Sequence, residues 1–217
     1  DQQAMRNHIT FLLEGGFKTG NGVILTGGAA GDFSTMSFDE RVMICETAVQ
    51  AVEGRIPVIL GAQTTNTREL IQLAKSAERI GAEYIQISPP YYFSSTEEDF
   101  YEYVVAASEA ADVGIIVYNT HWTSSGVSLD LAERLIELDN VVGLKWSVPG
   151  FEFMAFDRCL VRFANQVSVI DNQVTYVTSH MMGARGIELH PSNYWPQWGV
   201  KTWEMLEAGQ YVEAQKE

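Results

Sequence analysis

Lys145 is the residue of this sequence best suited to covalent chemistry. It lies in the run Val141–Ser147 (VVGLKWS), whose apolar residues predict a strand buried on both faces. Lysine is seldom buried, and removing water from an amine favours its neutral form. A neutral amine attacks ketones and aldehydes to form a Schiff base. The alternative is a lysine whose stem packs while its head reaches water.

Two other features have side-chain or backbone groups suited to such chemistry. Tyr118 ends an apolar run, and a phenol beside a carbonyl-binding lysine can transfer protons. The turn Gly28-Ala29-Ala30-Gly31 is small enough for its backbone N–H groups to approach an anion. It lacks the Gly-Lys-Ser/Thr ending of a P-loop and the spacing of a dinucleotide fingerprint. Alternatively, Tyr118 is structural and the glycine-rich segment is only a tight turn.

The elements that must position these groups alternate between short β-branched runs and amphipathic stretches. The candidate strands are 22–26, 57–62, 84–88, 114–119, 142–146, 167–170 and 186–190. The candidate helices are 3–14, 38–52, 67–80, 97–111, 129–138, 151–165, 176–182 and 196–216. Ser37 with Glu40 predicts a capping box, Asn66 a second helix cap, and Gly81 a helix end.

This alternation predicts an α/β protein, with a parallel sheet covered by helices, in one domain spanning residues 1–217. The steady spacing favours a (β/α)8 TIM barrel over an open doubly wound sheet, although the chain has one strand fewer than the about eight units of a complete barrel. We expect the missing strand to precede the first helix. In such barrels the reactive groups gather at the carboxyl ends of the strands, where Tyr118 and Lys145 are predicted to lie.

Composition excludes some classes of function. The 217 residues carry a formal net charge of −14, which argues against binding to nucleic acid. No apolar run is long enough to cross a membrane, and the N-terminus lacks the pattern of a signal peptide. We therefore expect no membrane partner and a cytoplasmic location. Cys45 and Cys159 fall in helical patterns without metal-ligand spacing, which indicates reduced, packed thiols.

Four segments together resemble a known family. The glycine-rich turn, Ser88-Pro89-Pro90-Tyr91-Tyr92, Tyr118-Asn119 and Gly143-Leu144-Lys145 occur in the order and spacing seen in the dihydrodipicolinate synthase / N-acetylneuraminate lyase family. The resemblance covers nearly the whole chain. Members begin about one strand earlier and continue further at the C-terminus, so the resemblance implies that this chain is truncated at both ends.

The resemblance implies a lyase of the class I aldolase type. Lys145 would form a Schiff base with pyruvate or another 2-oxo acid, for aldol cleavage, condensation or dehydration, and Tyr118 would relay protons. Gly28, Ala29, Ala30 and Gly31 would bind the substrate carboxylate, with Asn119 and His121 also near the substrate. Tyr92 matches a tyrosine that members contribute to a neighbouring subunit, which implies a homodimer or homotetramer. No cofactor is expected.

The chain departs from the family pattern at two places. Ala29 and Ala30 stand where the family turn usually has two hydroxyl residues that bind carboxylate and relay protons. Losing one such hydrogen bond to a charged group weakens binding by about 1.5–3 kcal/mol. No arginine follows Tyr118-Asn119 to bind a second carboxylate, which argues against true dihydrodipicolinate synthase activity. His121 and Trp122 would instead contact a different substrate tail, or His121 is an exposed loop residue.

Glu188 and His190 lie two residues apart in the last predicted strand and would share one face. If that face is the barrel interior, Glu188 is a substrate-binding residue and a replacement general acid/base. Alternatively, Glu188 forms an ion pair with Arg185 or Lys145. A third possibility is a divalent metal site of His121, Glu188 and His190, which Lys145 would oppose.

Three functions therefore remain open. The sequence favours a Schiff-base lyase acting on a 2-oxo acid, without a metal. The second is a binding or regulatory barrel derived from the same family, with little turnover. The third is a metal-dependent barrel enzyme. The sequence does not name the substrate.

Overall fold

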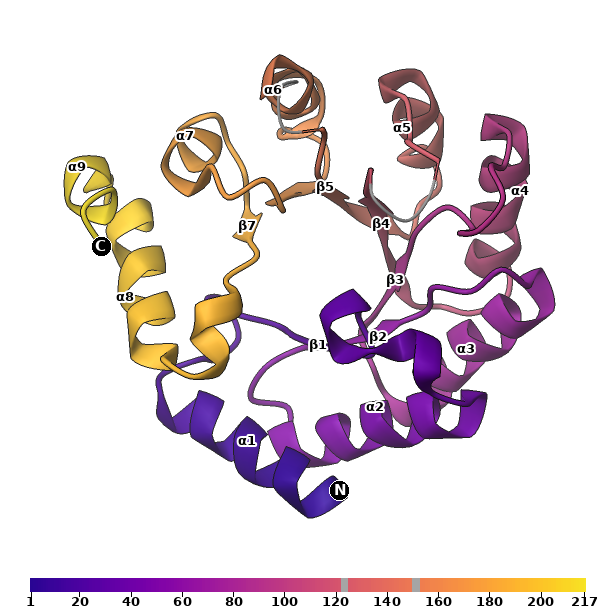
Figure 1. Ribbon diagram of the computed structural model, residues 1–217, viewed down its shortest axis with the longest axis horizontal. Helices are drawn as coiled ribbons and strands as arrows, with labels where there is room; N and C mark the ends of the chain where they lie inside the picture. Colours follow the sequence, from indigo (N-terminus) through magenta and orange to yellow (C-terminus); the bar gives the residue numbers. More distant parts are fainter. Residues whose placement is uncertain (122–124, 150–152) are drawn as a thin grey trace.

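A computed structural model describes residues 1–121, 125–149 and 153–217. Seven parallel strands form one sheet in sequence order, and the sheet curls with the helices on its outer side (Figure 1). The strands are β1 (Ile24–Thr26), β2 (Val58–Gly61), β3 (Tyr84–Ile87), β4 (Gly114–Asn119), β5 (Val141–Trp146), β6 (Ser168–Asp171) and β7 (Gly186–Ile187). This confirms a helix-covered parallel sheet curled as part of a barrel.

The helices follow the strands as the alternation predicts. They are α1 (Gln2–Glu14), α2 (Phe38–Val52), α3 (Thr67–Ile80), α4 (Glu97–Ser108), α5 (Leu129–Leu135), α6 (Phe153–Phe163), α7 (Tyr176–Met181), α8 (Pro196–Glu207) and α9 (Tyr211–Ala214). Three short 3₁₀ turns add η1 (Ala29–Gly31), η2 (Phe33–Thr35) and η3 (His190–Asn193). Residues 151 and 152, expected at the start of α6, lie outside the described residues.

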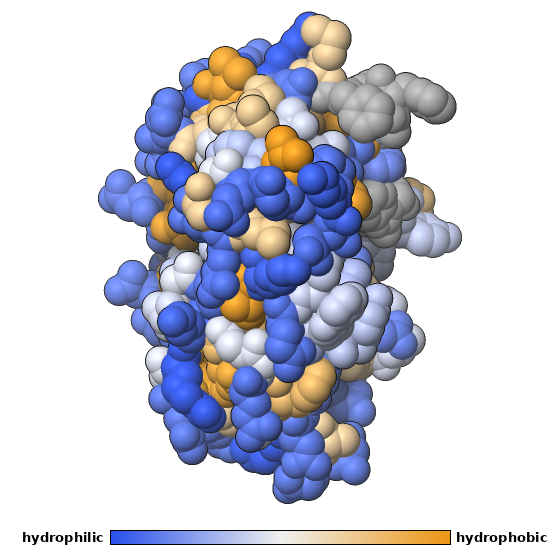
Figure 2. Space-filling model, turned by 90° about the vertical axis from the view of Figure 1, so that its left-hand side faces the viewer, coloured by the Kyte–Doolittle hydropathy of each residue, from blue (hydrophilic) through white to orange (hydrophobic). Residues whose placement is uncertain are grey.

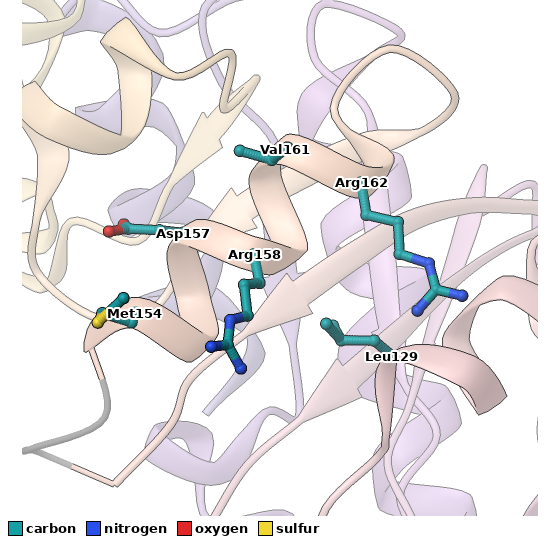
Figure 3. A pocket seen from close by; sticks show the side chains of 6 residues that line it. All are labelled: Leu129, Met154, Asp157, Arg158, Val161 and Arg162. Carbon is teal, nitrogen blue, oxygen red and sulfur yellow. The ribbon is translucent and has the colours of Figure 1, made fainter.

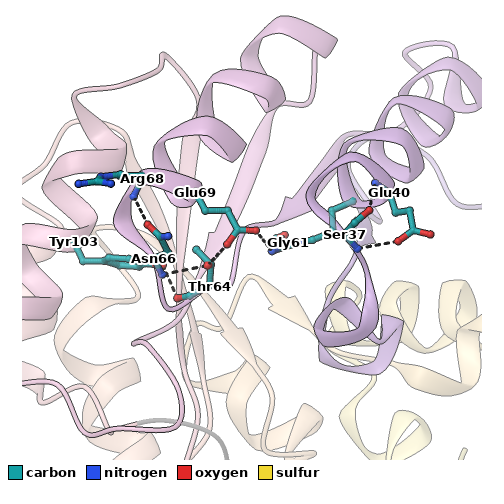
Figure 4. A network of polar contacts seen from close by, with 9 residues as sticks. Ser37, Glu40, Gly61, Thr64, Asn66, Arg68, Glu69 and Tyr103 are labelled. Atoms are coloured by element: carbon teal, nitrogen blue, oxygen red, sulfur yellow. Dashed lines mark hydrogen bonds and ion pairs between the residues drawn. The ribbon is translucent and has the colours of Figure 1, made fainter.

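Local signals explain where helices begin and end. Ser37 and Glu40 form the predicted capping box at α2, where each side chain satisfies a backbone N–H of the other residue. Asn66 caps α3 by accepting from the N–H of Arg68, and Gly81 ends that helix with a φ of 83°. Figure 4 shows both helix starts, together with contacts around Thr64.

Alternation along the strands separates the packed core from the barrel interior. Ile85, Val117 and Leu144 are fully buried in the apolar cluster that the sheet shares with its helices. The intervening residues, such as Tyr118 and Lys145, therefore point to the opposite, inner side of the curl. A chemically reactive set of side chains is thus kept apart from the apolar layer that stabilises the fold.

The curl does not close within the described residues. β1 and β7 are the two ends of the strand order, and no pairing joins them. In Figure 1, β7, α8 and α9 lie on the side away from α3 and α4. Figure 2 shows the corresponding face, which is mostly hydrophilic with separate apolar patches. None of the described helices is long and apolar enough to span a membrane.

The last predicted strand and the last predicted helix are wrong in extent. The strand expected over 186–190 ends at Ile187, because Pro191 lies in the 3₁₀ turn η3 that begins at His190. Glu188 and His190 therefore do not share the face of a strand. The helix expected over 196–216 divides into α8 and α9, and Gly209 lies between them with a φ of 69°.

Candidate active site

Lys145 and Tyr118 are direct neighbours across the β4–β5 pairing. Lys145 is buried, with 6% of its surface exposed. Its Nζ lies 4.5 Å from the centroid of the Tyr118 ring. The structure thus brings together the two residues that the sequence analysis predicted as catalytic, and Lys145 does not extend to the surface. A buried amine beside a phenol can combine nucleophilic attack with proton transfer.

The phenol of Tyr118 is held in a polar environment. Asn172 donates from Nδ2 to its oxygen across 3.2 Å. Burial raises the pKa of Tyr118, a shift that the side chains of Thr120 and Asn172 partly oppose, while the charge of Glu188 adds to it. The phenol therefore keeps its proton at neutral pH and can donate a hydrogen bond.

Asn172 is a site residue to which the sequence analysis assigned no role. It directly follows Asp171, a fully buried carboxylate at the end of β6. Asp171 accepts hydrogen bonds from the N–H of Gln173 at 2.5 Å and from Ser179 Oγ at 2.6 Å. These bonds fix the loop after β6 and so orient Asn172. The position of Asn172 just after the carboxyl end of a predicted strand is the sequence signal that could have identified it.

Glu188 contacts the candidate nucleophile. Its Oε2 forms an ion pair with Lys145 Nζ, and its Oε1 lies 3.4 Å from His190 Nε2. The Glu188 N–H donates to the carbonyl of Asp171 at 2.9 Å, and Tyr176 donates its hydroxyl to the Glu188 carbonyl at 3.1 Å. The ion pair with Lys145, which the sequence analysis gave as one alternative to a general acid/base role for Glu188, is therefore present.

Asn119 is the last residue of β4, and His121 lies in the loop that follows. Asn119 donates from Nδ2 to the carbonyl of Ser147 at 3.1 Å and accepts from the N–H of Val127 at 2.8 Å. His121 Nδ1 lies 3.2 Å from Ser147 Oγ. Both residues thus tie this loop to the end of β5, two residues beyond Lys145. Trp122 lies outside the described residues.

The glycine-rich turn forms the short 3₁₀ turn η1 after β1. The N–H of Gly31 donates to the carbonyl of Gly28 at 2.9 Å, while Ala29, Ala30 and Gly31 are exposed. The turn leads into η2, where Phe33 packs edge-on against Tyr91, 5.8 Å away between ring centroids. η2, which follows the turn, therefore lies against the loop after β3.

Tyr92 occupies an unusual backbone conformation on the surface. Its φ is 81° and 87% of its surface is exposed, with its ring packed edge-on against Phe93. A bulky residue with a positive φ is a backbone outlier, which structure elsewhere must enforce. The side chain does not join the described contacts of Lys145, Tyr118 and Glu188.

The residues of the metal-site hypothesis do not converge. His121 contacts Ser147, whereas Glu188 lies between Lys145 and His190. Over 1–121, 125–149 and 153–217, no three histidine, cysteine or acidic side chains are grouped as metal ligands would be. The positively charged side chain of Lys145 pairs with Glu188 Oε2, the oxygen that would otherwise be open to a metal cation.

A separate hollow lies on the outer helical layer. It has a volume of about 360 Å³ and is lined by Leu129, Met154, Asp157, Arg158, Val161 and Arg162. Figure 3 shows that these side chains come mainly from α6 and point outward. None of them was predicted as a site residue.

The model of the Dihydrodipicolinate synthetase family matches residues 1–217. The 4-hydroxy-tetrahydrodipicolinate synthase of Desulfotalea psychrophila is 29% identical over 208 residues, covering 94% of this chain and 69% of that protein. The synthase of Bradyrhizobium diazoefficiens is 31% identical over 199 residues, covering 91% of this chain and 65% of that protein. The chain thus spans about two thirds of the length of these curated relatives.

Solved structures agree with this assignment. Dihydrodipicolinate synthase from Aquifex aeolicus has a TM-score of 0.91 and 26% identity, covering all of this chain and 73% of that one. The Acinetobacter baumannii enzyme, solved in complex with pyruvate, has a TM-score of 0.90 and 26% identity with the same coverage. Sequence and fold agree: the chain belongs to the dihydrodipicolinate synthetase family, a family of lyases.

Proposed function

We propose that this chain carries the active site of a lyase that acts on pyruvate or another 2-oxo acid through a Schiff base on Lys145. The observation that carries the proposal is the position of the Lys145 amine, which is buried at the inner side of β5 and lies against the Tyr118 ring. Family membership and the pyruvate complex of the Acinetobacter baumannii relative support the same substrate class.

Each predicted residue receives a role in this proposal. The Lys145 amine attacks the keto carbon, and the resulting iminium withdraws electrons so that a neighbouring bond can form or break. The protonated phenol of Tyr118, oriented by Asn172, donates to the substrate oxygen. Backbone N–H groups of Gly28, Ala29 and Ala30 bind the carboxylate, because the N–H of Gly31 already donates to the carbonyl of Gly28.

The proposal also covers how copies of the chain associate and which fold the sheet belongs to. Tyr92 is exposed and held in a strained backbone conformation, and we propose that it contacts a second copy of the chain in a homo-oligomer. We further propose that the seven-stranded curl is part of a (β/α)8 barrel, consistent with the 73% coverage of solved relatives. A single domain over 1–217 and a cytoplasmic location stay predictions of the sequence.

Borohydride trapping tests the chemistry. The protein is incubated with pyruvate and borohydride, and peptide mass spectrometry locates the reduced adduct. We expect one adduct on Lys145, lost in Lys145→Met and retained in Lys75→Met, which changes an exposed lysine. Absence of an adduct with a panel of 2-oxo acids would contradict the proposal. An adduct without turnover of any member of the panel would instead identify a binding barrel.

A further inference from the structure

We propose that Glu188 is the catalytic proton acceptor for Lys145 and that His190 connects this carboxylate to solvent. This inference deepens the proposed Schiff-base function and rests on it. It gives the site a proton path that runs from the buried amine through both oxygens of one carboxylate to an imidazole.

The exposure of the three side chains rises along this path. The Lys145 side chain is 8% exposed, Glu188 is 24% exposed and His190 is 63% exposed. One oxygen of Glu188 faces the amine and the other faces the imidazole. The chain of contacts therefore begins at a buried reactive atom and ends at a group that exchanges protons with water.

Imine formation needs a proton acceptor at this site. A buried ammonium must lose a proton before it can attack a carbonyl. Alanines at 29 and 30 have no hydroxyl group to accept that proton. The phenol of Tyr118 keeps its own proton, because burial raises its pKa. Among the described residues, Glu188 is the carboxylate that forms an ion pair with Lys145.

The proton balance of the step is complete. Glu188 takes one proton from the Lys145 ammonium, and the freed amine adds to the keto carbon. One proton of the new C–N⁺H2 group moves to the former carbonyl oxygen, which gives a carbinolamine. The protonated Glu188 then returns its proton to the carbinolamine hydroxyl, which leaves as water while the nitrogen lone pair forms the iminium bond. Glu188 ends as a carboxylate, and no oxidant, reductant or metal is required.

Among the described residues, four ionisable groups interact with Glu188. Lys145 reaches it from β5, Tyr118 from β4, Tyr176 from α7, and His190 from η3. His190 is the most exposed of these partners of Glu188, and it acts as a positioning residue.

Glu188→Gln is the decisive variant, because the amide keeps the size of the carboxylate but cannot accept the proton. We expect its rate of borohydride trapping with pyruvate to fall about 10²–10⁴-fold, the usual contribution of general acid–base catalysis. Added formate should restore part of the rate in Glu188→Ala, where it can replace the missing carboxylate. Glu207→Gln is the matched control, since Glu207 pairs with His180 elsewhere at 2.8 Å.

His190→Gln tests the outer part of the path. We expect the rate of trapping to fall in the variant while KM for pyruvate stays unaltered. Equal trapping rates in the variant and the native protein would overturn the role of His190. Trapping by Glu188→Gln as fast as, or faster than, the native protein would overturn the role of Glu188 while leaving the Schiff base intact. Failure of the native protein to trap would overturn both proposals.

Discussion

Asn172 Nδ2 donates to the phenol oxygen of Tyr118 across 3.2 Å, joining the loop after β6 to the end of β4. Lys145 lies on β5, the strand between them. The hydrogen bond therefore spans the strand that carries the candidate nucleophile, and it orients the phenol over the same interior space. Tyr118 is held in place by a contact from beyond its own strand.

Tyr118→Phe removes the phenol proton and keeps the ring against Lys145. We expect kcat for turnover of a 2-oxo acid to fall about 10²–10⁴-fold, because the proton donor to the substrate oxygen is lost. Steady-state kinetics measure this effect, and Tyr194→Phe, at a residue 72% exposed, is the control. Unchanged turnover in Tyr118→Phe would show that the phenol has a structural role only.

Ala29→Thr and Ala30→Thr restore hydroxyl groups to the glycine-rich turn. A hydrogen bond to a charged carboxylate contributes about 1.5–3 kcal/mol, so we expect pyruvate to bind roughly 10–100-fold more tightly in the better of the two variants. Calorimetry or the concentration dependence of trapping measures the affinity. Ala29→Val is the matched control, since it has the shape of threonine without the hydroxyl.

Gly61 permits a close approach of two backbone segments at the mouth of the curl. A Cβ on Gly61 would lie 2.1 Å from the carbonyl oxygen of Gly27. Gly61→Ala must therefore displace backbone, and we expect a loss of at least about 1–3 kcal/mol in the free energy of unfolding. In Gly31→Ala nothing lies within 4 Å of the new carbon, so urea unfolding should show little change.

The buried thiols predict how stability varies in alkaline solution. Burial raises the pKa of Cys45 to about 11 and that of Cys159 to about 12, whereas an exposed thiol has a pKa of about 8.5. The unfolded chain therefore loses these protons first, and the free energy of unfolding falls as pH rises from about 9 towards 12. The contribution is fully present below about pH 8.

Urea unfolding at a series of pH values measures this dependence. In the variant Cys45→Ala/Cys159→Ala, the free energy of unfolding should fall less steeply above about pH 9, because the two thiols no longer contribute. Other titrating groups account for the decline that remains. An unchanged slope in the double variant would contradict this assignment. Thiol-reactive labels should also react with the native protein only after it unfolds, since both cysteines are buried.

Local sequence signals predicted the elements and the paired candidates Lys145 and Tyr118. Alternating apolar runs give strand positions, and strand ends in a parallel sheet meet at one edge, so neighbouring strands suffice to bring these two together. For Glu188, the sequence left open an ion pair with either Lys145 or Arg185. The position of the Glu188 side chain depends on the path of the chain after β7. Pro191 and the turn at His190 set that path, and strand alternation does not describe it.

Asn172 was not predicted as a site residue because its role depends on a distant partner. Its orientation follows from the hydrogen bonds of the neighbouring carboxylate Asp171 to Gln173 and Ser179. The target, Tyr118, is more than fifty residues earlier in the chain. A contact of this kind depends on the curvature of the whole sheet, which short-range patterns do not encode.

The brevity of β7 has a mechanical consequence. Lys145 lies inside β5, a strand of six residues, whereas Glu188 follows β7, a strand of two residues. Segments with few ladder bonds open at lower free energy than central strands. We therefore expect Glu188 to move more easily than Lys145. Binding of a substrate can then separate their ion pair by displacing the short segment after β7, while β5 and the rest of the sheet keep their structure.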